Sequence, residues 1–275
     1  MPAATLRVAS WNIRAAIGPG PFPDRWWNRI DADRLRAIGA FIERLDTDVI
    51  ALQEVAVLSR DGALVDNAGD LARRLGMEVR YAAVRTFDVI EDGERRGVGS
   101  FGNALLSRLP IGESRTVTLP QAPMEAFVEL PGSAHPMAGV RFADAPEDIR
   151  EPRCLLLARI DGLAVGTAHL SHIGSGERLL QAHAVQAAFG EASPALLLAD
   201  LNAAIDAPEL APLSAWTDGF QEPAGDAARM STDDGARIDH VLTRGASVHG
   251  CRVLRESAEL SDHYPVVAEV ALAGT

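Results

Sequence analysis

Residues 195–202 read ALLLADLN: five apolar residues run directly into Asp200, and Asn202 follows two positions later. A short and wholly apolar run of this kind is typical of a strand that is buried on both faces of a sheet. An acid at the end of such a strand is costly unless a partner satisfies it. An Asp-x-Asn sequence can also simply cap a strand, but the apolar run before it favours a functional interpretation.

The same pattern recurs along the chain. Five further strand-like runs, at 6–11, 49–53, 163–169, 238–242 and 266–272, each carry or adjoin a polar residue that a strand interior would not choose. In that order these residues are Asn12, Glu54, His169, Asp239 and the pair Asp262 and His263. Six runs of this type predict one polar crevice at a shared edge of a sheet.

The remaining pattern predicts an α/β chain. Further strand-like runs lie at 79–84, 103–106 and 154–160, and helical periodicity appears at 32–45, 67–75 and 177–189. Strands in succession suit antiparallel pairing, and the interposed helices suit packing on sheet faces. We expect a single domain over residues 1–275. The segments Gly18–Asp31, Val84–Gly102 and Pro120–Pro152 are interpreted as loops that set specificity.

Charge and composition narrow the function classes. The formal net charge is −12, and all 26 basic residues are Arg, because the chain of 275 residues contains no Lys. The absence of Lys excludes Schiff-base chemistry and a Walker-type phosphate loop. The acidic balance disfavours a broad nucleic-acid track, whose affinity comes from cations on phosphates, but an acidic protein can still carry a local cleft lined by Arg.

Compartment and cysteine chemistry follow from the same sequence. No apolar run is long enough for a transmembrane segment, and strand-like sequence begins at Leu6, so we expect a cytoplasmic protein. Cys154 and Cys251 are expected to be free thiols, since a disulfide is uncommon in that compartment. The polar crevice itself offers hard oxygen ligands, which suit Mg²⁺ or Mn²⁺ better than Zn²⁺.

An ordered set of motifs resembles the endonuclease/exonuclease/phosphatase superfamily, the group of pancreatic-type deoxyribonuclease, abasic-site endonucleases, neutral sphingomyelinases and inositol polyphosphate 5-phosphatases. Each motif alone is weak, but together they stand in the family's order and span residues 6 to 270. The motifs are WNI with Asn12, LQEV with Glu54, GNALLSR with Asn103 and Arg108, AHLSH with His169, ADLN with Asp200 and Asn202, IDHV with Asp239, and SDHYP with Asp262 and His263.

The resemblance implies a four-layer α/β/β/α sandwich, in which two mixed β-sheets pack face to face with helices outside and the site at one end. Two departures from the family pattern stand out. The usual GDFN is ADLN here, which keeps both functional side chains. Val55 follows Glu54 where abasic-site endonucleases carry Lys, which weakens a DNA-repair interpretation.

The resemblance also implies roles for the metal and the water. Glu54 would be the main ligand of Mg²⁺ or Mn²⁺, with Asn12 and Asp262 completing the site directly or through water. Asp200 would orient or deprotonate the attacking water, and Asn202 would hold that water or a phosphate oxygen.

The histidines and arginines complete the candidate set. Asp239 would fix His263 as an imidazolium that binds the charge developing on phosphorus, and His169 would contact a phosphate oxygen or protonate the leaving group. Asn103, Arg108 and Arg153 are candidates for binding the phosphate. For both arginines a structural ion pair is as consistent with the sequence as substrate contact.

Three functions remain open at this point. The first is divalent-metal-dependent hydrolysis of a small or lipid-linked phosphoester, as a phosphodiesterase or a phosphatase. The second is an endonuclease or exonuclease on DNA or RNA, which the net charge disfavours. The third is a non-catalytic binding protein on the same fold, which an intact set of site residues disfavours. The sequence carries no prediction of oligomeric state.

Overall fold

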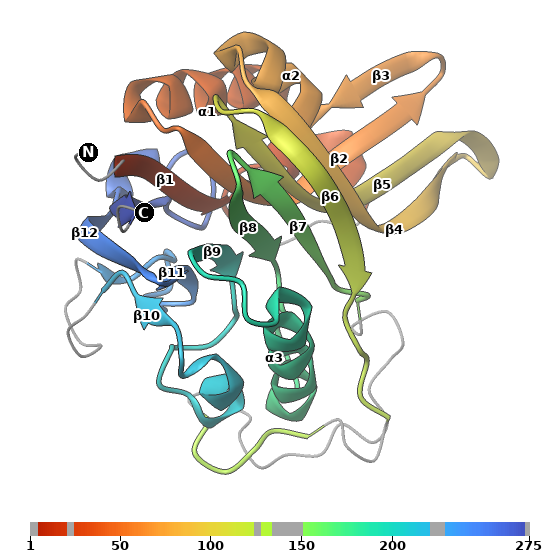
Figure 1. Cartoon of the computed structure of the whole chain (residues 1–275). Helices are drawn as coiled ribbons and strands as arrows, with labels where there is room; N and C mark the ends of the chain where they lie inside the picture. Colours follow the sequence, from red (N-terminus) through yellow and green to blue (C-terminus); the bar gives the residue numbers. More distant parts are fainter. Residues whose placement is uncertain (1–4, 21–24, 124–127, 134–150, 221–228, 273–275) are drawn as a thin grey trace.

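The computed structural model describes residues 5–20, 25–123, 128–133, 151–220 and 229–272. Two β-sheets lie face to face, with helices on their outer sides (Figure 1). In chain order, with η for a 3₁₀ helix, the elements are β1 Thr5–Asn12, η1 Arg14–Ala16, η2 Trp26–Arg29, α1 Ala32–Leu45, β2 Val49–Arg60, β3 Ala63–Asp66, α2 Asn67–Leu75, β4 Glu78–Glu91, β5 Glu94–Ser107, β6 Ile111–Thr118, β7 Cys154–Ile160, β8 Leu163–Ala168, α3 Ser175–Phe189, β9 Ala195–Asp200, η5 Pro208–Leu213, β10 Thr217–Asp218, β11 Asp239–Arg244, β12 Ala246–Val253, η7 Arg255–Ser257 and β13 Val266–Leu272.

Each sheet is built around one parallel pair of strands. The first sheet has the order β12-β13-β1-β2-β5-β4, with β3 added to β2, and the second has the order β10-β11-β9-β8-β7-β6. Strands β1 and β2 are parallel and joined through α1, and β8 and β9 are parallel and joined through α3. The other described strand pairs are antiparallel.

Three layers of apolar packing hold the sandwich together. Val8 and Leu105 of the first sheet pack against Leu198 of the second in the core between the sheets. Helices α1 and α2 cover the outer face of the first sheet, and α3 with η5 covers the outer face of the second. The predicted sandwich of two mixed sheets is thereby confirmed.

Three Asp–Gly turns shape the hairpins. Asp92 and Gly93 both have positive φ, as the central residues of the tightest hairpin turns do, and the same dipeptide turns the chain at 61–62 and 161–162. The prediction that 84–102 is a loop is therefore wrong. Strands β4 and β5 run through this segment as one long hairpin, because the turn needs only two residues.

Other differences lie at the sheet edges. Strands β3, β6, β10 and β12 were not predicted, and α3 begins two residues before its expected start. Within the predicted loop 120–152, the structure describes residues 120–123, 128–133 and 151–152 only. Cys154 and Cys251 are free thiols, as expected. None of the helices in the described residues is long and apolar enough to cross a membrane.

Candidate active site

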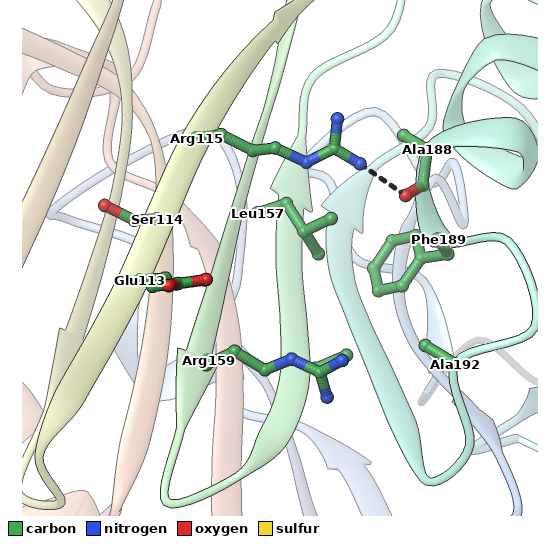
Figure 2. Close-up of a pocket in the computed structure, with 10 residues that line it drawn as sticks. Glu113, Ser114, Arg115, Leu157, Arg159, Ala188, Phe189 and Ala192 are labelled. Atoms are coloured by element: carbon green, nitrogen blue, oxygen red, sulfur yellow. Dashed lines mark hydrogen bonds between the residues drawn. The ribbon is translucent and has the colours of Figure 1, made fainter.

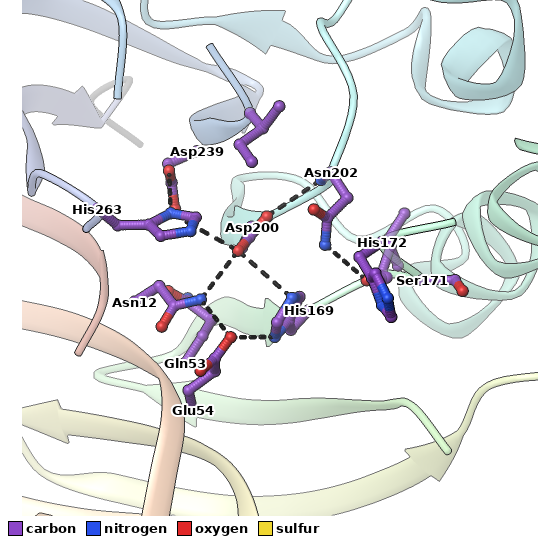
Figure 3. A network of polar contacts seen from close by, with 12 residues as sticks. Asn12, Gln53, Glu54, His169, Ser171, His172, Asp200, Asn202, Asp239 and His263 are labelled. Carbon is purple, nitrogen blue, oxygen red and sulfur yellow. Dashed lines mark hydrogen bonds and ion pairs between the residues drawn. The ribbon is translucent and has the colours of Figure 1, made fainter. Parts of the chain in front are cut away.

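The two parallel strand pairs, one in each sheet, bring polar side chains to the same edge of the sandwich. Asn12 is the last residue of β1 and pairs in register with Gln53 of β2, next to Glu54. In the second sheet, His169 follows β8 and forms a bridge with Asp200, the last residue of β9. Because the carboxyl ends of parallel strands meet at one edge and the sheets are packed face to face, the two pairs converge (Figure 3).

Two antiparallel strands add residues from their starting ends. Asp239 opens β11 and lies opposite Asp200 in register. His263 precedes β13, and its carbonyl accepts a hydrogen bond of 2.9 Å from Trp11 Nε1. The Ser261 hydroxyl donates to the Asn12 carbonyl at 2.8 Å. The tryptophan of WNI and the serine of SDHYP therefore fix His263 beside the end of β1.

Glu54 lies in a β-bulge. Leu52 pairs with Ala104 but Val55 pairs with Gly102, so two residues of β2 face one residue of β5. Leu52 and Val55 consequently pack in the same apolar cluster although they are three positions apart. The extra residue, Glu54, has a φ of 53°, in a region that costs a residue with a Cβ about 1–2 kcal/mol. The bulge directs its carboxylate into the site.

Asn12 and Asp200 form the centre of the polar network. The Asn12 amide donates to Glu54 Oε1 at 3.0 Å and to Asp200 Oδ2 at 3.1 Å, so it bridges the two carboxylates. His169 Nε2 lies 3.4 Å from the same Asp200 oxygen. The other oxygen, Oδ1, accepts the Asn202 backbone N–H at 3.1 Å. One carboxylate thus contacts residues from both sheets (Figure 3).

Asp239 and His263 form the predicted pair. His263 Nδ1 lies 2.8 Å from Asp239 Oδ2. Burial alone would lower the pKa of His263, but the carboxylates of Asp239 and Asp200 outweigh burial and hold this pKa well above its ordinary value. His263 is therefore an imidazolium at neutral pH, with its ring held in place by Asp239.

For the other buried titratable groups of the site, the pKa shifts favour the neutral form. Burial and the nearby Arg153 cation lower the pKa of His169 well below its ordinary value, so this ring is neutral. Burial raises the pKa of Glu54 to about 7. Burial, together with repulsion from Asp239, raises the pKa of Asp200 to about 6. The site therefore combines one cationic and one neutral imidazole with two carboxylates that a cation would stabilise.

The donor set fits a hard divalent cation. Glu54 Oε2 is buried and accepts no hydrogen bond from the part of the chain that the structure describes, which leaves an oxygen suited to a metal. Asp200, Asp239 and His263 also place ligand atoms within 4.8 Å of one another. The imidazolium of His263 cannot bind a cation while it stays protonated, so the Glu54 side is the better position.

The motif order now has independent support. A family model described as "Endonuclease/Exonuclease/phosphatase family" matches residues 9–263. The chain belongs to the endonuclease/exonuclease/phosphatase family. Members of this family are generally phosphoester hydrolases. No curated protein matches the chain.

Solved structures share the family fold. An endonuclease/exonuclease/phosphatase from Beutenbergia cavernae DSM 12333 is 22% identical, with a TM-score of 0.72 over 98% of this chain and 72% of that chain. A mannosyl-6-phosphatase of Bacteroides thetaiotaomicron VPI-5482 is 20% identical, with a TM-score of 0.61 over 97% and 100%. D. rerio TDP2, complexed with a single-strand DNA product, is 16% identical, with a TM-score of 0.58 over 97% and 99%. At these identities the likeness shows the fold alone.

Two residues of the family-like GNALLSR motif, Asn103 and Arg108, make their side-chain contacts outside the polar network. Arg108 follows β5 and forms an ion pair with Asp46, which precedes β2, whereas Glu54 lies further along β2 toward the site edge. The Arg108 guanidinium lowers the pKa of that Asp46 carboxyl. Asn103 lies opposite the bulge, but its amide donates to the Cys154 carbonyl at 3.1 Å and so ties β5 to β7 of the other sheet.

Arg153, unlike Arg108, lies beside the polar network. It is 4% exposed, and its Nη2 is 3.3 Å from His172 Nδ1 and 3.2 Å from Glu151 Oε2. Arg85 of β4 contacts the same Glu151 carboxylate at 3.5 Å. The charge of Arg153 helps to keep His169 neutral, and Glu151, which pairs with both arginines, helps to raise the pKa of the Glu54 carboxyl.

Sequence reasoning missed Gln53, the residue before Glu54. It is fully buried, and its amide donates to Ser10 Oγ at 3.2 Å, to Thr167 Oγ1 at 3.0 Å and to the Leu198 carbonyl at 3.3 Å. These three partners stand two positions before Asn12, His169 and Asp200. Gln53 therefore ties both sheets together directly beneath the site, and a polar residue within an otherwise apolar run was the available signal.

Arg14 was missed as well. Its Nε lies 3.1 Å from Asp262 Oδ2, and its Nη1 donates to the Gly18 carbonyl at 2.7 Å. Asp262, one of the predicted metal ligands, is half-buried and close enough to Glu54 to raise the pKa of that residue. The signal was the Arg that directly follows WNI.

Proposed function

We propose that the protein hydrolyses a phosphoester of a small molecule with Mg²⁺ or Mn²⁺ as cofactor. The observation that carries this proposal is the buried Glu54 carboxylate, which has an oxygen without a hydrogen bond in the described residues and lies in one network with the imidazolium of His263. A metal ligand beside a fixed cation suits the negative charge that phosphoryl transfer concentrates on the phosphate oxygens.

Glu54 and Asp262 would hold the cation, and Asn12 would orient the Glu54 carboxylate through its 3.0 Å hydrogen bond. A bound Mg²⁺ or Mn²⁺ would neutralise phosphate oxygens and stabilise the leaving oxygen. The cation would also keep Glu54 ionised, since burial raises its pKa to about 7 despite the hydrogen bond from Asn12 and the nearby charge of His263.

Asp200 would take a proton from the attacking water. Its pKa of about 6 leaves it ionised at neutral pH yet more basic than an exposed carboxylate, which favours general-base catalysis. The hydrogen bond from the Asn202 N–H to Oδ1 and the contact of Asn12 with Oδ2 fix its orientation. Asn202 itself donates to the Leu170 carbonyl at 2.9 Å, so its amide links the two strand ends that flank this water position.

The two histidines would act differently on the phosphate. The imidazolium of His263 would stabilise the charge of the pentavalent phosphoryl group, and Asp239 would keep the ring charged and aligned. His169 is neutral, so it would donate a hydrogen bond to a phosphate oxygen rather than supply a proton to the leaving group. This refines the role that the sequence left open.

A small substrate agrees with the surroundings of the site. A cavity of about 500 Å³ lies beside Asn202 and His172, within the range of roughly 300–1,000 Å³ that is usual for small-molecule pockets. The net charge of −12 disfavours a long phosphate backbone.

The test is hydrolysis of p-nitrophenyl phosphate, bis(p-nitrophenyl) phosphate and a panel of small phosphoesters, with and without EDTA and with Mg²⁺ or Mn²⁺ restored. We expect turnover only with metal. Asp200→Asn should lower kcat by about 10²–10⁴-fold, as expected for loss of a general base. Glu54→Gln should weaken metal activation.

Glu43→Gln is the matched control for Glu54→Gln. Glu43 lies on α1 and pairs with Arg74 at the surface, so we expect this variant to behave as wild type. A wild-type protein that hydrolyses no phosphoester with any divalent cation would contradict the proposal. Nicking of a supercoiled plasmid at a higher kcat/KM than any small ester would favour the nuclease alternative.

A further inference from the structure

The cavity beside Asn202 is the strongest unassigned feature next to the site, and this inference rests on the proposed function. We refer to it as the alanine cavity, because Ala203, Ala204 and Ala207 form part of its lining. It begins at Asn202 and His172, the second of which contacts Arg153. A phosphate held by His263 and His169, next to Asn202, would therefore have its organic group directed at this space.

The alanine cavity has a mixed wall. Its alanines and Ile238 present an apolar surface, and Glu209 and Arg237 add two charged side chains that are 1% and 5% exposed. Glu209 Oε2 accepts no hydrogen bond and Arg237 Nε donates none within the described residues. The wall thus combines an apolar surface with a carboxylate and a guanidinium whose side chains are both buried.

The cations of this wall are already neutralised. Arg178 donates to Glu209 Oε1 at 2.8 Å and to the Ser171 carbonyl at 3.2 Å. Arg237 pairs with the buried Asp218 carboxylate and donates to the Phe220 carbonyl at 3.4 Å. Asp234, also in the lining, is exposed and adds a negative charge. A second anion on the substrate would therefore meet acids without a free cation among these residues.

From this chemistry we infer that the alanine cavity is the subsite for the organic group of the substrate, and that this group is uncharged and carries hydroxyls, as in a sugar or polyol phosphate. A hydroxyl both donates and accepts, so it suits a wall that carries both the Glu209 carboxylate and the Arg237 guanidinium. The alanines leave room for a ring, and their methyl groups suit its C–H faces. A second phosphate or a nucleic-acid strand is disfavoured by the same wall.

The first experiment compares kcat/KM for a hexose 6-phosphate, a hexose 1,6-bisphosphate and a single-stranded oligonucleotide, with Mg²⁺ present. The monophosphate should be preferred over the bisphosphate by about tenfold, because the second anion enters an acidic wall. Equal or better use of the bisphosphate or of the oligonucleotide would overturn the inference.

The second experiment fills the cavity. Ala204→Phe should lower kcat/KM for the hexose 6-phosphate by about tenfold or more through loss of the space for the ring. The inhibition constant of inorganic phosphate, which needs only the phosphate position, should stay within about twofold. Unchanged kcat/KM in a folded Ala204→Phe protein would overturn the inference, as would an equal weakening of inorganic phosphate.

The matched control places the same change in another cavity. A space of about 430 Å³ on the outer face of the second sheet is lined by Ala188, Phe189 and Leu157, away from the polar network (Figure 2). Ala188→Phe should leave both kcat/KM and the phosphate inhibition constant unchanged. A loss of kcat/KM equal to that of Ala204→Phe would show a general packing effect and would overturn the inference.

A surface variant keeps the inference testable if Ala204→Phe does not fold. Asp234→Asn removes one negative charge from the cavity wall and should raise kcat/KM for the bisphosphate by about threefold relative to the monophosphate. Asp161→Asn makes the same charge change at the exposed β7–β8 turn and should leave that ratio unchanged. A ratio unaffected by Asp234→Asn would overturn the inference.

The outcomes separate this inference from the function on which it rests. Turnover of other phosphoesters without the monophosphate preference would overturn the sugar or polyol assignment alone. Absence of turnover on every phosphoester would overturn the proposed function and the subsite with it.

Discussion

Glu54 has both an unfavourable backbone conformation and a carboxyl group with an unusual pKa. Its φ of 53° is unfavourable for a residue with a Cβ, and burial raises the pKa of its carboxyl to about 7. A raised carboxyl pKa means that the folded state binds the proton more tightly than the unfolded state does. This contribution to stability is fully present below pH 4.5 and is lost as pH rises through about 7.

We therefore expect the metal-free protein to lose stability between pH 4.5 and 7, with about 3 kcal/mol of the change due to Glu54. The measurement is the free energy of unfolding against pH for wild type and Glu54→Gln, both in EDTA. The variant should lack the part of this pH dependence that is due to Glu54, and saturating Mg²⁺ should reduce the same part in wild type. If the free energy of unfolding depended on pH in the same way in both proteins, the buried Glu54 carboxyl with its raised pKa would be contradicted.

Asp239 sets the charge of His263 and thus the alkaline limit of activity. The carboxylate raises the pKa of His263 above its ordinary value, so Asp239→Asn should lower that pKa and shift the alkaline limb of the kcat profile toward lower pH. Activity near pH 8 should fall more than activity near pH 6. An unchanged alkaline limb with a uniformly lower kcat would instead indicate that Asp239 only aligns the ring.

At the scale of elements, Gln53 joins strands that belong to different sheets. Gln53→Leu leaves the hydroxyl of Thr167 and the carbonyl of Leu198 without their hydrogen bonds from this amide, which should cost about 1–3 kcal/mol of the free energy of unfolding. It should also lower kcat and weaken metal activation, because the strands beneath Asn12 and Asp200 lose their common link. Denaturant unfolding and kcat at several Mg²⁺ concentrations measure both effects.

Asn103→Leu is the comparison for this variant. Asn103 also connects the two sheets, through the Cys154 carbonyl, but it does not contact the strands that end in Asn12 and Asp200. We expect a similar loss of stability with a smaller loss of kcat. A loss of kcat as large as that of Gln53→Leu would favour the predicted role of Asn103 in binding the phosphate.

Elements with strong local patterns were predictable. Helix α1 has its apolar face in sequence, and the Asp31 side chain caps it by accepting from the N–H groups of Asp33 and Arg34. Strands β7 and β13 are apolar runs whose observed bounds match the expectation. The β4–β5 hairpin was missed because its outer half is exposed and lacks a continuous apolar run, so only Asp92–Gly93 signalled it.

The site was partly predictable for a related reason. Asn12 and Asp200 end buried strands and Glu54 lies within one, and a polar residue at such a place is visible in the sequence. The sequence does not show in this way whether Arg14 and Arg108 belong to the site or to a structural ion pair, because an Arg at a strand end can reach any nearby acid. Their partners, Asp46 and Asp262, became known only from the packing of elements that lie far apart in the chain.

At the scale of the whole molecule, the net charge of −12 argues against electrostatic capture of a polyanion. We expect kcat/KM for a small phosphoester to change by less than about threefold between 50 and 200 mM salt, whereas contacts with many phosphates would change it by several orders of magnitude. Steady-state kinetics at fixed Mg²⁺ over this range measure the effect. A steep fall of kcat/KM with salt would favour a nucleic-acid substrate.

The single domain over residues 1–275 stays a prediction.

The order of the strands also bears on synthesis at the ribosome. Strand β13 pairs with β1 along its length, and His263 directly precedes β13, whereas the entire second sheet lies between them in the chain. A nascent chain that has not yet exposed β13 therefore has β1 open on one side and lacks the imidazolium. The first sheet cannot close, and the proposed chemistry cannot begin, until this late strand has emerged, so unfinished chains would be inert toward cellular phosphoesters.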